Sequence, residues 1–277
     1  MKNDSGMKSA VPPYLFRRGG GALIVSLPHV STYVPPTIAN RHTEAAAQRP
    51  DTDWHLPRLY DFLAELDATV ITATHSRYVV DLNRPPDDVS LYPGRVTTGL
   101  CPLETFHGAP VYLENCAPDS AEIAQRVERY WKPYHQRLAA ELARIRAQHG
   151  VAMLWDAHSI VSEAPRLFEG RLPDFNLGTA DGKSCDASLA TDLEAILHKH
   201  HGFTSVHNGR FKGGYITRHY GQPANGIHAV QMEMACSTYM QETLPYSFDN
   251  VGASRVRHVL RELFDRLIEF TKKDKTQ

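Results

Sequence analysis

The 277-residue sequence predicts an α/β fold of three layers, in which a mixed central sheet lies between two layers of helices. Apolar runs of strand length alternate along the chain with segments whose apolar residues recur at helical spacing. Several apolar runs also end in histidine or charged residues, as in open α/β sheets that place their chemistry at one edge. The length fits one large domain at least as well as two small ones, and we expect a single domain over residues 1–277.

The strands of this sheet are expected where short apolar runs meet turn-forming or polar residues. Residues 1–20 mix Gly, Pro and charge and are expected to form a flexible lead-in. Strands are then expected at residues 22–27, 78–80, 151–155 and 228–235. The last of these alternates polar and apolar side chains, so its polar residues should share one face.

The clearest helix is expected from about Ser120 to Gln148. Asp119 precedes it as a capping residue, Glu122 follows three residues later, and Gly150 lies just beyond its end. Other helices are expected at three places: from about Asp53, between Asp186 and Gly202, and over about 254–271. Residues 272–277 should form a frayed tail.

The composition excludes several classes of partner. Lys and Arg number 30 against 31 Asp and Glu, so the net charge of −1 gives no basic field for a nucleic acid or an anionic membrane. The longest apolar stretches are far below the ~20 residues that cross a bilayer, and the first residues lack a signal-peptide core. We therefore expect a cytoplasmic protein. Its four scattered cysteines make no C-x-x-C pair and are expected to be reduced thiols.

Two long segments, 85–118 and 159–184, have little periodicity and much Gly, Pro and Asp. Loops this long inside a compact domain are usually functional, because ordering them costs entropy and adds little core. We expect them to act as substrate lids.

Two histidines follow apolar strands and could share a metal ion. Neutral imidazoles from His29 and His158 suit zinc, although either residue alone could be a simple capping or hydrogen-bonding group. Asp53 or Asp51 could supply a third ligand, and each could instead cap a helix. Asp156 is better placed as a hydrogen-bonding partner that orients His158.

Charged and amide side chains near two other strands suggest substrate contacts and a base. Arg84 offers a planar fork for a carboxylate and Asn83 a directed hydrogen bond, while the alternative is an ion pair between Arg84 and Asp81. Partial burial would raise the pKa of Glu233, which suits a general base. The alternative for Glu233 is a hydrogen-bonded structural carboxylate.

A basic loop over residues 208–218 contains Arg210, Arg218 and a Gly-Gly turn followed by Tyr215. Such a loop can hold an anionic small molecule, and a solvated surface loop is the alternative.

In order along the chain, these motifs resemble the N-formylglutamate amidohydrolase (N-formylglutamate deformylase) family over roughly residues 22–240. The matching segments are Pro28-His29, Asp53, Ser76-Arg77-Tyr78, Asp81-Leu82-Asn83-Arg84-Pro85-Pro86, Asp156-Ala157-His158-Ser159, Gly213-Gly214-Tyr215 and Gln231-Met232-Glu233. The resemblance implies a phosphorylase/hydrolase-like fold related to zinc carboxypeptidases and aspartoacylase. It also implies a zinc enzyme that hydrolyses N-formyl-L-glutamate to formate and L-glutamate in histidine degradation.

The resemblance further implies roles for individual residues. His29 and His158 become ligands of one Zn²⁺ per chain, and Glu233 becomes the base. Arg77 resembles the arginine that polarises the scissile carbonyl in the aspartoacylase relatives, although its distance to Arg84 is one residue shorter here. Those relatives place a glutamate three residues after the first histidine, where this chain has Thr32. We therefore expect the third ligand to be Asp53.

The expected reaction begins with a zinc-bound water that loses its proton to Glu233 and attacks the formyl carbon. Zinc and Arg77 stabilise the oxyanion, and Glu233 then protonates the departing nitrogen. The dicarboxylate substrate needs two cationic anchors: Arg84 with Asn83 for one, and Arg210 or Arg218 near Tyr215 for the other. The alternatives are another N-acyl amino acid or short peptide as substrate, or a metal-free protein that binds anionic metabolites.

Overall fold

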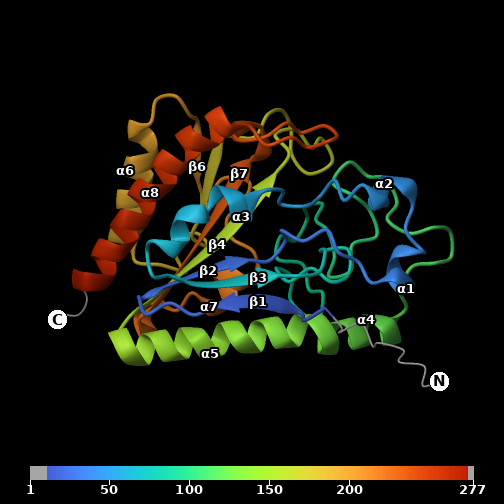
Figure 1. The fold of residues 1–277 in the computed structure, drawn as a ribbon, viewed down its shortest axis with the longest axis horizontal. Helices are drawn as coiled ribbons and strands as arrows, with labels where there is room; N and C mark the ends of the chain where they lie inside the picture. Colours follow the sequence, from blue (N-terminus) through green and yellow to red (C-terminus); the bar gives the residue numbers. More distant parts are fainter. Residues whose placement is uncertain (1–10, 274–277) are drawn as a thin grey trace, which may run out of the picture.

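A mixed seven-stranded sheet forms the centre of the molecule and confirms the predicted three-layer α/β fold (Figure 1). The computed structural model describes residues 11–273. The strand order is β1-β3-β2-β4-β7-β5-β6, with β2, β3, β4 and β7 parallel to one another. β1 and β5 run antiparallel to their neighbours β3 and β7. The strands are β1 (Tyr14–Arg17), β2 (Leu23–Leu27), β3 (Thr69–Ala73), β4 (Ala152–Ile160), β5 (Phe175–Gly178), β6 (Ser205–His207) and β7 (Ile227–Ala235).

Helices cover both faces of the sheet, as the layers in Figure 1 show. On one face α3, α6 and α8 pack against side chains such as Val25 and Trp155. On the other face α5 and α7 pack against side chains such as Ile24 and Leu154. The helices are α1 (Pro36–Ala39), α2 (Glu44–Ala47), α3 (Leu56–Leu59), α4 (Ser120–Arg126), α5 (Lys132–His149), α6 (Ala187–Lys199), α7 (Tyr215–Tyr220) and α8 (Asn250–Lys273).

The predicted long helix is present as α4 and α5, joined by a π-helical turn over Val127–Trp131. Asp119 caps its start by accepting a hydrogen bond from the backbone N–H of Glu122, and Gly150 ends it in a left-handed conformation. Pro133 is the second residue after the π turn. It has no N–H to donate to the preceding turn, which explains why the helix widens here.

The predicted lead-in over residues 1–20 is wrong for Tyr14–Arg17, which form the edge strand β1. Residues 1–10 lie outside the described part of the chain, as do 274–277 of the predicted tail, whereas Lys272 still belongs to α8. Gly19 lies against the turn that precedes β3. A Cβ at this position would lie 2.1 Å from the carbonyl oxygen of Asp67, so glycine is needed for this close packing.

The predicted strand at residues 78–80 is also wrong. Its apolar side chains are buried, but its backbone forms turns after β3 has ended at Ala73. An apolar run predicts burial, and here the core receives a loop instead of a strand. Arg77 and Asp81 consequently lie in this loop, at the carboxyl end of β3.

Two further element boundaries differ from the predictions. β4 continues beyond residue 155 to Ile160, so Asp156 and His158 lie inside the strand and share one face of it. The short helix expected from Asp53 begins only at Leu56, which leaves Asp53 in the preceding turn. Among the helices of residues 11–273, none is both long enough and apolar enough to span a bilayer.

Candidate active site

Three predicted metal ligands meet at the carboxyl end of the parallel strands. His29 lies just after β2, Asp53 in the turn before α3 and His158 in β4, and all three are buried. Their potential ligand atoms lie within 4.8 Å of one another. His158 Nδ1 is 3.1 Å and His29 Nδ1 is 3.9 Å from Asp53 Oδ2. A backbone hydrogen bond from the Asp53 N–H to the His29 carbonyl holds the two loops together.

Two buried atoms of this cluster have no hydrogen-bond partner among residues 11–273: His29 Nδ1 and Asp53 Oδ1. Buried polar atoms are nearly always paired, because leaving one unpaired costs about 1–3 kcal/mol. A metal ion ligated by the cluster would satisfy both atoms. Two imidazoles and one carboxylate also match the ligand set of a catalytic zinc site, so these residues fit the metal that the sequence led us to expect.

Asp51, the other aspartate that the sequence offered as a third ligand, lies outside the cluster. Both carboxylate oxygens of Asp51 accept a hydrogen bond from the backbone N–H of Phe106, at 3.1 and 3.0 Å. Asp51 therefore anchors the long loop 85–118. Asp53 is the aspartate that faces the histidines.

A carboxylate contacts the Nε2 atom of each histidine in the cluster. Asp156 Oδ2 lies 3.0 Å from His158 Nε2, in the place expected for its orienting partner. Asp81 Oδ1 lies 2.7 Å from His29 Nε2, a role that the sequence reasoning missed. Such partners fix the ring orientation and leave Nδ1 facing the ligand position. Asp81 pairs with Arg77 at 2.8 Å rather than with Arg84, so the alternative ion pair is not formed.

Charge and burial set the protonation of these side chains in opposite directions. Burial, together with the Arg77 guanidinium, lowers the pKa of His29 and favours the neutral ring that a metal requires. Burial also opposes ionisation of Asp81, but His29 and Arg77 outweigh it and hold the pKa of Asp81 well below its ordinary value. His158 behaves differently. Burial would lower its pKa, yet Asp156 and Asp53 raise it well above the ordinary value in the metal-free protein.

Glu233 lies beside the cluster because β4 and β7 are paired in register. His158 is opposite Glu233 and Asp156 is opposite Gln231, so all four side chains lie on one face of the sheet. Burial raises the pKa of Glu233 to about 8. A carboxyl group with a pKa this close to neutrality can both take up and release a proton at working pH. Gln231 orients this strand end by accepting a hydrogen bond from the Gly214 N–H, at 2.7 Å.

Arg77 lies on the other side of the cluster and is buried. Its guanidinium is 2.8 Å from Asp81 and 3.9 Å from Asp53, and it stacks 4.8 Å from the centre of the Phe106 ring. Its Nε has no hydrogen-bond partner among the described residues. The Arg77 cation is thus held in place by carboxylates, and its side chain lines the pocket.

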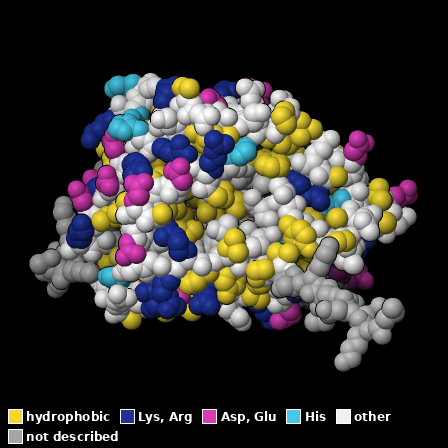
Figure 2. All heavy atoms as spheres, in the orientation of Figure 1, with side chains coloured by type: hydrophobic (Ala, Val, Ile, Leu, Met, Phe, Trp, Pro, Cys, Tyr) yellow, Lys and Arg dark blue, Asp and Glu magenta, His cyan; other side chains and the backbone are white. Residues whose placement is uncertain are grey.

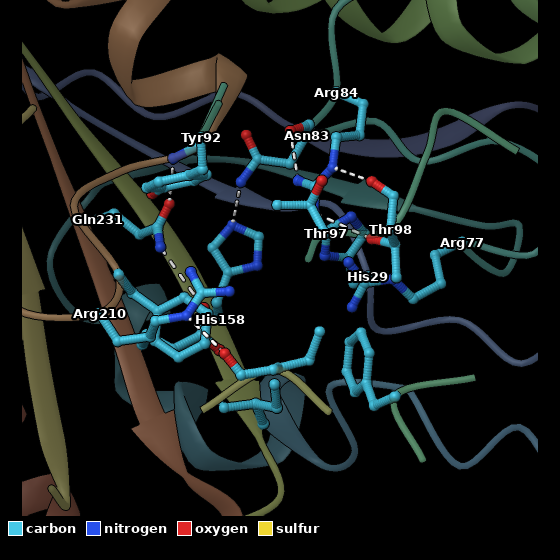
Figure 3. Close-up of a pocket in the computed structure, with 16 residues that line it drawn as sticks. His29, Arg77, Asn83, Arg84, Tyr92, Thr97, Thr98, His158, Arg210 and Gln231 are labelled. Carbon is cyan, nitrogen blue, oxygen red and sulfur yellow. Dashed lines mark hydrogen bonds between the residues drawn. The ribbon is translucent and has the colours of Figure 1, made fainter. Parts of the chain in front are cut away.

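A pocket beside the cluster is lined by two arginines from different loops, Arg84 and Arg210 (Figure 3). Arg84 donates to the backbone and hydroxyl oxygens of Thr98, at 2.8 and 2.9 Å. Arg210 donates to the backbone carbonyl of Leu167, at 2.8 Å, and lies over the Tyr92 ring. Neither arginine has a carboxylate within ion-pair distance in residues 11–273. The pocket is lined by His29, Arg77, Asn83, Arg84, Tyr92, Thr97, Thr98, Phe106, His158, Ile160, Leu167, Arg210, Phe211, Gly214, Gln231 and Glu233.

Three other predicted substrate contacts have different surroundings. Asn83 lines the pocket, but its amide nitrogen lies 2.8 Å from His158 Nε2 and 3.1 Å from Asp156 Oδ2. Tyr215 and Arg218 are outside the pocket lining. Tyr215 stacks on His219, and Arg218 donates to the backbone carbonyl of Gly213. The long loop 85–118, by contrast, contributes Tyr92, Thr97, Thr98 and Phe106, as a substrate lid would.

Residues 21–240 match the family model of the N-formylglutamate amidohydrolases. The chain belongs to this family. It is 51% identical over 253 residues to the N-formylglutamate deformylase of Pseudomonas aeruginosa, covering 91% of this chain and 95% of the relative. The identity to the enzyme of the same name from Pseudomonas putida is 49%, with coverage of 91% and 94%.

The fold agrees with a solved member of the N-formylglutamate amidohydrolase family. The crystal structure of N-formylglutamate amidohydrolase from Ralstonia eutropha JMP134 superposes with a TM-score of 0.81 at 24% identity. The match covers 95% of this chain and 99% of the other. At this level of identity the likeness establishes the α/β architecture, while the site residues rest on the geometry described above.

Proposed function

We propose that this protein is a zinc-dependent hydrolase that cleaves N-formyl-L-glutamate to formate and L-glutamate, as a step of histidine degradation in the cytoplasm. The observation that carries the proposal is a pair of arginines, Arg84 and Arg210, that have no carboxylate partner among residues 11–273 and line the same pocket as His29, His158 and Glu233. The names of the two bacterial relatives support the same substrate.

The ligand cluster would hold the metal through His29 Nδ1, His158 Nδ1 and the Asp53 carboxylate. When bound, zinc acidifies water and polarises a carbonyl group. Asp81 and Asp156 keep the two rings turned so that Nδ1 faces the metal position. Three ligands from the chain would leave one position open for water or substrate, as in catalytic zinc sites.

Glu233 is proposed as the general base and acid. It would remove a proton from the attacking water and later deliver that proton to the nitrogen of the departing glutamate. Its burial beside His158 supports both steps, because the carboxyl group exchanges a proton near neutral pH. Arg77 would stabilise the negative charge that develops on the formyl oxygen, through its Nε–H, which has no hydrogen-bond partner among residues 11–273.

The two substrate carboxylates would be bound by cations on different walls of the pocket. Arg84, next to Asn83, would receive one carboxylate, and Arg210 the other. The geometry favours Arg210 over Arg218 as the second anchor, because only Arg210 lines the pocket. Arg218 and Tyr215 would then act outside the pocket lining, by holding in place the loop that carries Gly213 and Gly214.

The test is formate release from N-formyl-L-glutamate by the purified full-length chain, before and after chelation and after zinc is restored. We expect activity that is lost with the metal and returns with zinc. N-acetyl-L-aspartate and a short peptide with a free carboxyl terminus serve as competing substrates. Equal or faster turnover of either one would overturn the substrate assignment. A protein that takes up no stoichiometric zinc and stays inactive when zinc is added would overturn the reaction and favour a metabolite-binding protein.

A further inference from the structure

A second group of potential metal ligands lies where the end of α6 meets α8, on the face of the sheet opposite the pocket. His200 is the residue that caps the carboxyl end of α6, whereas His258 and Glu262 are one turn apart on α8. α6 and α8 lie side by side in Figure 1, and Figure 2 shows histidine side chains gathered among Lys and Arg over the same helices. None of these residues takes part in the proposed hydrolysis.

The three side chains already have the spacing of metal ligands. His200 Nε2 lies 3.3 Å from Glu262 Oε2, and His258 Nε2 lies 3.2 Å from Glu262 Oε1. All three ligand atoms are within 4.8 Å of one another. Zinc bonds of about 2.0–2.1 Å in a tetrahedral site place neighbouring ligand atoms about 3.3 Å apart. The two imidazole rings stand almost perpendicular, at 88°, with their centroids 5.6 Å apart.

An unpartnered buried nitrogen points to a ligand rather than to an ordinary ion pair. His200 Nε2 is buried and makes no hydrogen bond to any described residue, although Glu262 is close enough in distance. Its direction therefore does not suit donation to the carboxylate, while its lone pair is available to a cation. His258 is 72% exposed, so water can complete the coordination of an ion bound there.

We propose that His200, His258 and Glu262 form a second metal site that binds a divalent transition-metal ion, with zinc as the best match. Two imidazoles select a transition metal over Mg²⁺ or Ca²⁺, which prefer sites made of oxygen ligands. The neighbouring cations Lys199 and Arg255 line the same groove and favour an anion or hydroxide as the remaining ligand. A bound ion would join the end of α6 to α8 and stabilise this junction.

The experiment is a calorimetric titration of zinc into the tag-free full-length chain, comparing wild type with His258→Gln. His201→Gln is the matched control, because His201 lines the same groove but lies outside the ligand group. His258 is largely exposed, so its replacement leaves the fold intact. We expect wild type and His201→Gln to bind one zinc ion per chain more than His258→Gln. Glu262→Gln should lose the same ion.

Thermal unfolding and activity provide two further readouts. Zinc should raise the unfolding midpoint of wild type more than that of His258→Gln, since the site exists only in the folded chain. Formate release should be equal in all variants. The result depends on a difference between variants, so it holds whether or not the active site also takes up zinc. Identical isotherms for wild type and His258→Gln, or an equal loss in His201→Gln, would overturn the proposal.

Discussion

Replacing Glu233 with glutamine is expected to stabilise the metal-free protein and to remove the activity of the zinc-loaded protein. Burial raises the pKa of Glu233 from 4.5 to about 8. Above pH 4.5 the unfolded chain releases this proton, whereas the folded protein keeps it until about pH 8. Each pH unit in this window lowers the free energy of unfolding by about 1.4 kcal/mol, which amounts to about 3 kcal/mol at pH 7. Glutamine has no proton to release and avoids this cost.

The direction of the effect with pH follows from the same reasoning. Well below pH 4.5 both states of the wild-type protein hold the proton, so wild type and Glu233→Gln should differ little through this group. As the pH rises toward 8, wild type should lose stability relative to the variant, and above about pH 8 the difference should become constant. Glutamine cannot act as a base, so kcat should fall about 10²- to 10⁴-fold.

The assay is denaturant unfolding of chelator-treated wild type and Glu233→Gln at pH 5, 6, 7 and 8, together with formate release by the zinc-loaded proteins. Glu163→Gln is the control, because Glu163 is exposed in the loop after β4 and its replacement should leave the pH profile unchanged. A stability difference that stays flat between pH 5 and 8, or a wild type that is more stable at pH 7, would refute the account of Glu233 as a carboxyl group destabilised by burial.

Three further predictions concern the surroundings of the site. Asp81→Asn should weaken zinc binding about 10- to 100-fold, measured by competition with a chelator, because Asp81 orients His29; unchanged affinity would contradict this role. Gly214→Ala should lower kcat/KM about 10²-fold, since the new Cβ would lie 2.4 Å from the Asn83 amide nitrogen and displace it from the site; wild-type kinetics would show that this approach is not required. Burial lowers the pKa of His135 to about 3. Below pH 6.5 the unfolded chain therefore takes up a proton on this side chain that the folded protein does not, and the free energy of unfolding falls by about 2 kcal/mol at pH 5. In denaturant unfolding, His135→Gln should reduce this loss of stability with falling pH.

The sequence was sufficient to predict the layers of the fold, because both strand and helix signals are periodic. The apolar stripe on α4 and α5 indicates which side of the helix is buried, and the alternation in β7 separates its polar face from its apolar face, although both faces of that strand are buried. The same signals misplaced residues 78–80, since an apolar loop that packs into the core has the composition of a short strand. β1 was missed because four residues at a sheet edge, half of them well exposed, leave too short a pattern.

The candidate site was predicted in part for a similar reason. His29, His158 and Glu233 could be found because each belongs to, or directly follows, a strand whose direction is fixed by the sheet. Asp81 could not be assigned as the partner of His29, since its position depends on the path of a loop that leaves β3 and turns back. The choice of Asp53 over Asp51 also depends on a turn, and no periodic pattern separates two carboxylates that are two residues apart.

The register between β4 and β7 also makes the proposed catalytic arrangement an all-or-none property of the chain. A shift by a single residue would turn Glu233 to the opposite face of the sheet, away from His158. Because these two central strands are hydrogen-bonded along their whole length, local opening cannot loosen one partner without breaking the core. Variation in what the protein accepts should therefore arise in the loop 85–118, which borders the pocket without taking part in this pairing. The proposed chemistry thus depends on the strand pairing in the sheet, whereas the loop can change without disturbing that pairing.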